Sequence, residues 1–163
     1  MSTETIPTVR EYTRQRLAGA HGRYSKDIKH FTDEQFTASP GGKARSPLQI
    51  TAEVGMINDV CAKLIKGEAV EGASEEGFAA AMAQYNTRDK AVGLLNSGTA
   101  ALDSALANVS DADLQTEVSA PWGGTCTKQY LADACCMNVD YHDGQLNLVQ
   151  CMNGDTTIHW MEE

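Results

Sequence analysis

Residues 131–152, LADACCMNVDYHDGQLNLVQCM, predict the last long helix of the fold. Counting from the first of them, one set of residues recurs at alternating steps of four and three, the spacing of a single face of an α-helix. The members of this inward stripe are Leu131, Cys135, Asn138, His142, Gln145, Val149 and Met152. An unpaired amide or imidazole in a core costs about 1 to 3 kcal/mol. We therefore expect Asn138, His142 and Gln145 to bond one another, to line a pocket or to hold an ion.

The second long helix has the clearest start and end. Ser46-Pro47-Leu48-Gln49 places Ser at the cap, Pro at the first helical position and Gln where it completes a capping box. Gly67 supplies the stop. The inward stripe reads Ile50, Glu53, Ile57, Val60 and Leu64. A competing stripe runs through Ile50, Val54, Ile57 and Cys61, so Glu53 is expected at the centre of the buried face or at its edge.

The rest of the chain predicts further helices joined by loops. Residues 8–31 predict a first helix, and 37–42 a loop. Ser74 can cap a short helix through Tyr85, and Thr87 can cap a longer one through Val109, as one bent helix or two. In that longer helix Gly98 is a tolerated weak point. Residues 114–126 fit a loop or short hairpin. The pattern predicts one all-α domain, residues 1–163, built as an antiparallel four-helix bundle.

Composition narrows the classes of partner. The chain has 163 residues and a net charge of −9. This negative charge disfavours non-specific binding to nucleic acid or anionic lipid, because both are themselves negatively charged. No stretch approaches the roughly 20 apolar residues that span a bilayer, and the first residues lack the pattern of a signal peptide. We expect a cytoplasmic protein. The five cysteines are an odd set without a C-x-x-C pair, which predicts free thiols.

Several motifs together resemble the DinB/YfiT-like superfamily. They are the Arg45-Ser46-Pro47-Leu48-Gln49-Ile50 entry to the second helix, the Pro121-Trp122-Gly123 turn, and Tyr141-His142-Asp143-Gly144-Gln145-Leu146 followed by Asn153-Gly154-Asp155. The resemblance covers nearly the whole chain. It implies a four-helix bundle, a homodimer, and a divalent metal such as nickel or zinc held by three histidines. Characterised relatives include thiol-dependent transferases and isomerases, and others have no assigned activity.

Only one of the three implied histidines is present. His142 matches the final one, because it stands immediately before Asp143-Gly144-Gln145. The histidine implied four residues earlier falls on Asn138, and the one implied on the second helix falls on Glu53. A carboxylate and an imidazole are good ligands for zinc or nickel, but an Asn carbonyl is a poor one. The resemblance thus implies either a weak metal site at Glu53, Asn138 and His142, or a polar network in which Asn138 and Gln145 satisfy the imidazole.

The other histidines are weaker candidates. His21 lies on the inward stripe of the first helix and could substitute as a ligand, but a lone histidine on an apolar face is more often a satisfied core residue. His30 and His159 stand near helix ends and are expected to face solvent.

Two function hypotheses remain open at this level. One is a small-ligand binder with a degenerate metal site, in which Gln145 contacts the ligand in the bundle cavity. The other is a divalent-metal- and thiol-dependent transferase or isomerase, in which His142 acts as ligand or general base. Both need a small molecule as ligand or substrate, and fold alone does not separate them.

Overall fold

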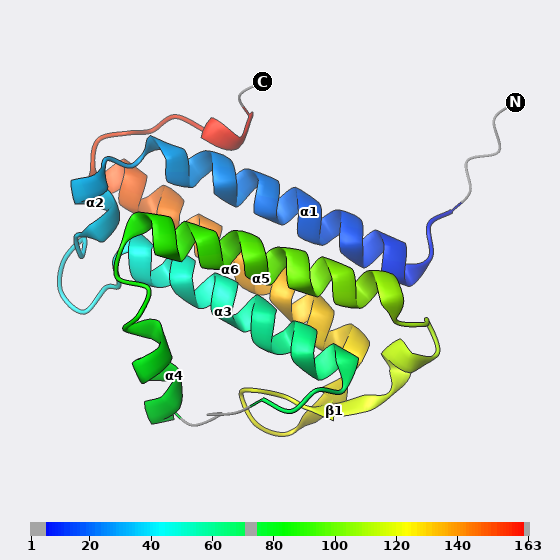
Figure 1. Ribbon diagram of the computed structural model, residues 1–163. Coiled ribbons are helices and arrows are strands. Elements are labelled where there is room, and N and C mark those ends of the chain that lie inside the picture. The colour runs from blue at the N-terminus through cyan, green and yellow to red at the C-terminus, as the bar shows by residue number, and fades with distance from the viewer. Residues whose placement is uncertain (1–5, 71–74, 162–163) are drawn as a thin grey trace, which may run out of the picture.

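The computed structural model describes residues 6–70 and 75–161. This part of the chain is mostly helical (Figure 1). The six α-helices are α1 (Val9–Asp27), α2 (Asp33–Thr37), α3 (Pro47–Lys66), α4 (Glu75–Met82), α5 (Arg88–Asn108) and α6 (Lys128–Met152). Short 3-10 helices are η1 (Ile28–His30), η2 (Asp113–Gln115) and η3 (His159–Met161). The strands β1 (Glu117–Ser119) and β2 (Thr125–Thr127) pair antiparallel and form a hairpin. The all-α expectation is confirmed at this level.

Local capping explains where the long helices begin. Ser46 and Gln49 form the expected capping box, and Gly67 ends α3 with a left-handed φ of 78°. Thr87 caps α5 through its side chain, as predicted, and Thr127 caps α6 in the same way. The segment around residues 74–109 forms two helices rather than one. Ser74, the expected cap of the first, lies outside the described residues.

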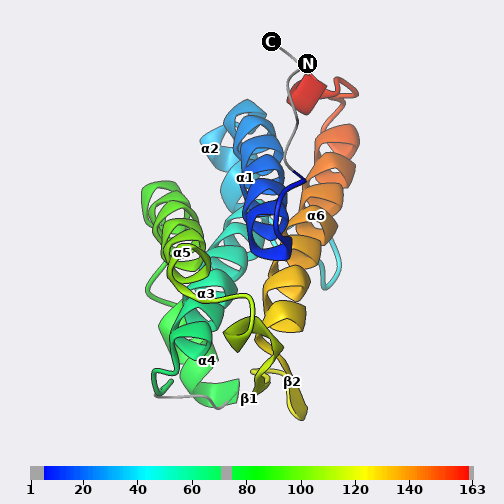
Figure 2. The ribbon, with the colours of Figure 1, turned by 90° about the vertical axis from the view of Figure 1, so that its right-hand side faces the viewer.

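The four long helices α1, α3, α5 and α6 lie side by side (Figures 1 and 2). Their directions differ from the predicted antiparallel arrangement. Contacts advance together along α3 and α5, from Gly55 against Leu95 to Asn58 against Thr99, so these two helices run parallel. α1 and α6 are also parallel, whereas α1 runs antiparallel to α5, and α3 to α6. The physical reason is the long link between α3 and α5, which includes α4 and lets the chain return to the end from which α3 started.

α3 and α5 approach so closely that two glycines are required. A Cβ on Gly55 would lie 2.5 Å from the backbone nitrogen of Leu95, and a Cβ on Gly98 would overlap the carbonyl oxygen of Gly55. Neither obstacle is a movable side chain. Gly98, a tolerated weak point in the sequence, is therefore the position where α5 can touch α3.

The core follows the predicted stripes only in part. On α3 the competing stripe is the buried one, since Ile50, Val54 and Cys61 are buried, whereas Glu53, Ile57, Val60 and Leu64 are only partly buried. On α6, Leu131, Cys135, His142 and Val149 are buried, but Met152 at the end of the stripe is 60% exposed. His159 is also buried, contrary to expectation, because its ring stacks on that of His30 with centroids 3.4 Å apart. His30 is exposed, as expected. In the described part of the chain, no helix is long and apolar enough to cross a membrane.

The glycine contact between α3 and α5 gives the first prediction. We expect Gly98→Ala to lower the free energy of unfolding by about 1–3 kcal/mol or more, because the new methyl group meets backbone rather than a side chain that can move. Gly93→Ala is the matched control on the same helix, since a Cβ there meets nothing within 4 Å. It should raise stability by up to about 1 kcal/mol. Urea denaturation measures both, and equal effects would contradict the close contact.

Candidate functional site

The antiparallel packing of α3 against α6 brings two of the expected site residues together. Nε2 of His142 lies 3.6 Å from Oε1 of Glu53. The His142 side chain is 2% exposed and the Glu53 side chain 20%, so Glu53 lies at the edge of the buried face. This position agrees with the apolar stripe through Val54, which is fully buried.

The His142 ring is held by its own helix. Its Nδ1 lies 2.7 Å from Oε1 of Gln145, three residues along the chain. A carbonyl oxygen only accepts, so Nδ1 carries the proton and donates it. The amide nitrogen of Gln145 donates in turn to the Tyr141 hydroxyl at 3.0 Å. In the neutral ring the unprotonated Nε2 therefore faces the Glu53 carboxylate.

Electrostatics keep the imidazole neutral near pH 7. Burial lowers the pKa of His142 below its ordinary value, and the positive charge of Arg45 lowers it further, while the hydrogen bond to Gln145 opposes the shift. Because the folded pKa is lowered, the unfolded chain binds the proton more readily. The contribution of His142 to stability is thus complete above the ordinary pKa of about 6.5 and declines as the pH falls below it.

Arg45 completes the polar chain from the loop before α3. Its guanidinium forms an ion pair with Oε2 of Glu53. On the α6 side, Asn138 stands one turn before His142, and its amide nitrogen is buried without a hydrogen-bond partner among the described residues. Within the polar stripe, the bond between Nδ1 of His142 and Gln145 is made, whereas the Asn138 amide nitrogen is left without a partner.

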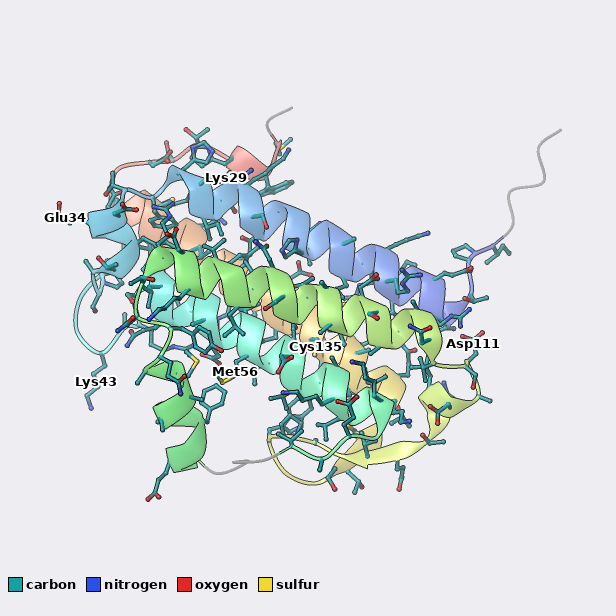
Figure 3. The ribbon with its side chains drawn as sticks, viewed as in Figure 1. Lys29, Glu34, Lys43, Met56, Asp111 and Cys135 are labelled. Atoms are coloured by element: carbon teal, nitrogen blue, oxygen red, sulfur yellow. The ribbon has the colours of Figure 1, made fainter. Side chains whose placement is uncertain are left out.

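A surface groove of about 500 Å³ adjoins this chain of contacts. Its lining includes Arg45, which forms the ion pair with Glu53, and Gln145, which accepts the hydrogen bond from His142. The remaining lining residues are Pro40, Gly41, Lys43, Ala44, Ile50, Leu148, Val149 and Met152. Lys43 projects from the loop before α3, at one end of the helices (Figure 3). The lining combines apolar side chains with the basic groups of Lys43 and Arg45 and the amide of Gln145, whereas Glu53 and His142 do not line the groove.

The residues present do not fit a tightly held divalent metal. Zinc sites usually have three or four nitrogen, sulfur or carboxylate ligands, and in the described residues no group of three or more His, Cys, Asp or Glu could hold an ion. Glu53 and His142 supply two such groups, and the amide of Asn138 would be a poor third. Arg45 also places its positive charge beside the Glu53 carboxylate, where it would repel a bound cation.

The other sequence candidates lie in different settings. His21 bonds to Asn96 of α5 at 3.0 Å and to Ser25 at 3.4 Å. Its ring therefore has hydrogen-bond partners within the protein, the more common of the two roles expected for it. All five cysteines are free thiols, as predicted. Cys135 lies in the middle of the helical core (Figure 3), where its thiol hydrogen-bonds with that of Cys61. Sequence reasoning missed Arg45 as a partner of Glu53, although it begins the motif at the entry to α3.

Comparison with known proteins supports the fold alone. No protein-family model and no curated protein matches the chain. Its structure is similar to the crystal structure of a conserved protein from Enterococcus faecalis, with a TM-score of 0.71 and 14% sequence identity. The match covers 90% of this chain and 98% of the other. At this identity the likeness shows a shared arrangement of helices.

The hydrogen bond to Gln145 gives the second prediction. Nitrogen-15 NMR of the His142 ring at pH 8 should show the Nδ1–H tautomer, and titration should give a pKa below 6.5. In Gln145→Ala we expect the proton to move to Nε2, because Glu53 Oε1 is then the nearest acceptor. Gln129→Ala, on the same helix but bonded to Thr13 and Asp133, should leave the tautomer unchanged. An Nε2–H ring in the wild type would refute the assignment.

Proposed function

We propose that the protein is a DinB/YfiT-like four-helix bundle that binds a small molecule in the groove beside Gln145. On this proposal the metal site of the family is degenerate, and no divalent metal is needed for binding. One observation carries the proposal: the groove is walled by the same Arg45 and Gln145 that hold Glu53 and His142. The polar chain then serves to fix the wall rather than to react with the ligand.

The chemistry of the lining favours an anion with an apolar part. Lys43 and Arg45 bring positive charge to the rim of the groove, while Ile50, Leu148 and Val149 offer hydrocarbon. A carboxylate with a short alkyl chain can satisfy both kinds of group. Burying each CH₂ against such a surface stabilises a complex by about 0.8 kcal/mol.

The alternative function is a thiol-dependent transferase or isomerase, and one observation favours it. The neutral His142 has its Nδ1–H anchored and its Nε2 unprotonated, as a general base requires. Against it, His142 does not line the groove. Thiol-dependent turnover that disappears in His142→Ala would support this second function.

The ligand proposal is tested with hexanoate as the probe. We expect saturable binding, followed by the amide shifts of Gln145 and Val149, with butyrate binding about tenfold more weakly because it has two fewer CH₂ groups. Lys43→Gln should weaken binding up to about fivefold, because an exposed ion pair contributes up to about 1 kcal/mol of binding free energy. Lys29→Gln, another exposed lysine on a different segment, is the matched control.

Chelator treatment separates the two parts of the proposal. Protein stripped with EDTA should bind hexanoate with unchanged affinity, and a loss that nickel or zinc restores would show that a metal takes part. No hexanoate binding in any sample would reject this groove as the site for such an anion.

We further propose that the protein forms a homodimer through α6. Three large apolar or aromatic side chains outside the groove, each more than half exposed, follow one face of this helix: Tyr130, Met137 and Tyr141. Steps of seven and four place them in line. In Figure 2, α6 stands at the edge of the helical core, with one side turned away from the other helices. A self-complementary face of this kind suits a two-fold partner.

The dimer prediction needs only a mass measurement. Light scattering should give twice the chain mass for the wild type, and Met137→Glu should shift the protein to monomer, because a charge in an apolar interface is costly. Ile158→Glu is the control, an exposed apolar residue that lies off the α6 face. A monomeric wild type at the highest concentration measured would contradict the proposal.

A further inference from the structure

The chain beyond α6 turns back along α1 as a strap, residues 154–161 (Figure 1). Backbone hydrogen bonds to the last turn of α6 hold its first two residues. The large apolar side chains near its end are 41–67% exposed, namely Ile158, Trp160 and Met161. His159 differs from them, because only 5% of it is exposed. His159 is therefore the side chain that the strap buries against the helices.

Two contacts define the setting of the His159 ring. At its edge, Nε2 lies 2.7 Å from Oδ2 of Asp155, a residue of the strap itself. At its face, the ring stacks on that of His30 in η1, with centroids 3.4 Å apart and planes 8° from parallel. The first contact shapes the strap, and the second joins it to the end of α1.

Asp155 keeps its charge in mild acid. The hydrogen bond from His159, together with that from the Thr157 backbone, lowers the pKa of Asp155 to about 2. A lowered folded pKa stabilises the strap fully above the ordinary value of about 4, and this stabilisation is lost as the pH falls toward 2. Between pH 7.5 and pH 5 the carboxylate is thus present to balance one charge. Histidine is the side chain that ordinarily gains a charge in this range.

The stack tolerates one charged ring better than two. Charge on both His30 and His159 would place like charges 3.4 Å apart, a distance at which they repel even in partly solvated protein. Two neutral rings, or one charged and one neutral, avoid this repulsion. The contact that joins the strap to η1 therefore depends on how many protons the pair carries.

The neighbouring cations come from α1 and η1. Lys26 and Lys29 precede His30 by four residues and by one, and their positive charges disfavour a second charged ring. Arg23, one turn earlier on α1, bonds to Asp140 of α6 at 2.7 Å. These groups act in the same direction as the repulsion within the stack.

Two buried carboxyl groups lie between this end of α1 and α6. Asp27, the last residue of α1, accepts a hydrogen bond from the Asn147 amide at 2.7 Å. Burial and the neighbouring Asp27 raise the pKa of Asp143 to about 7, and Asp143 lines the same surface hollow as Trp160. Asp143 thus titrates in the same pH range as histidine, so a test of the strap has to separate the two.

We propose that residues 154–161 form an acid-released strap, which lies on α1 while at most one ring of the His30–His159 pair is charged and leaves α1 when both rings are charged. The released strap separates the rings, so it takes up the second proton more readily than the bound strap. By linkage, the ratio of bound to released strap is highest above the ordinary histidine range and falls by up to about tenfold for each pH unit below about 6.5. Release also withdraws Trp160 from the hollow that it lines with Gly144 and Asn147, and so uncovers this side of α6.

The test is nitrogen-15 NMR of the full chain at pH 7.5 and at pH 5. Heteronuclear NOE values should show the amides of residues 156–161 ordered at pH 7.5 and mobile at pH 5, while those of α1 and α6 stay ordered at both. Strap amides that stay ordered at pH 5 would overturn the proposal. A loss of order that spreads through α1 and α6 would also overturn it, because acid would then unfold the whole protein.

Variants identify the groups that respond to acid. His30→Phe keeps a flat ring in the stack and removes its charge, so the strap should stay bound at pH 5. His21→Phe is the matched control, since His21 bonds to Asn96 of α5, and it should leave the release unchanged. Asp143→Asn removes the other group that titrates near pH 7, and release should persist in it. Release that persists in His30→Phe, or that disappears in Asp143→Asn, would place the acid response outside the histidine pair and reject the proposal.

Discussion

The close contact of α3 with α5 at Gly55 and Gly98 is the constraint on which the rest of the arrangement depends. Backbone meets backbone there, so the two helices have one depth and one register at which they can pack. Glu53 stands two residues before Gly55, and two residues on a helix turn the side chain by about 200°. Fixing Gly55 against α5 therefore directs Glu53 to the other side of α3, where α6 lies.

α6 uses consecutive residues for two different polar clusters. His142 points toward α3 and Glu53, whereas Asp143 points toward α1 and Asp27. Neighbouring helical residues point about 100° apart, so a helix packed between two others can serve both. Gln145 and Asn147 repeat the division, the first bonding His142 and the second Asp27. A single polar stretch of sequence thus faces both α3 and α1.

The two clusters respond to pH in opposite directions for the same reason. Burial disfavours charge, so it lowers the pKa of the His142 imidazole and raises that of the Asp143 carboxyl. Acidification costs stability at His142 and adds it at Asp143. Near pH 7 the buried imidazole is neutral and the Asp143 carboxyl is about half protonated, so burial reduces the charge held inside this small helical protein.

The sequence by itself determined the local features, and the tertiary structure decided which of them meet. The starts of α3, α5 and α6 follow from cap residues within one turn, and helical periodicity alone placed Asn138, His142 and Gln145 on one face. The helix directions could not be read in the same way, because the link that contains α4 is long enough for either direction. Contacts between distant residues, such as Arg45 with Glu53 or Asp27 with Asp143, depend on helix packing, which is set by the free energy of the whole core. A pattern of a few residues does not contain that information.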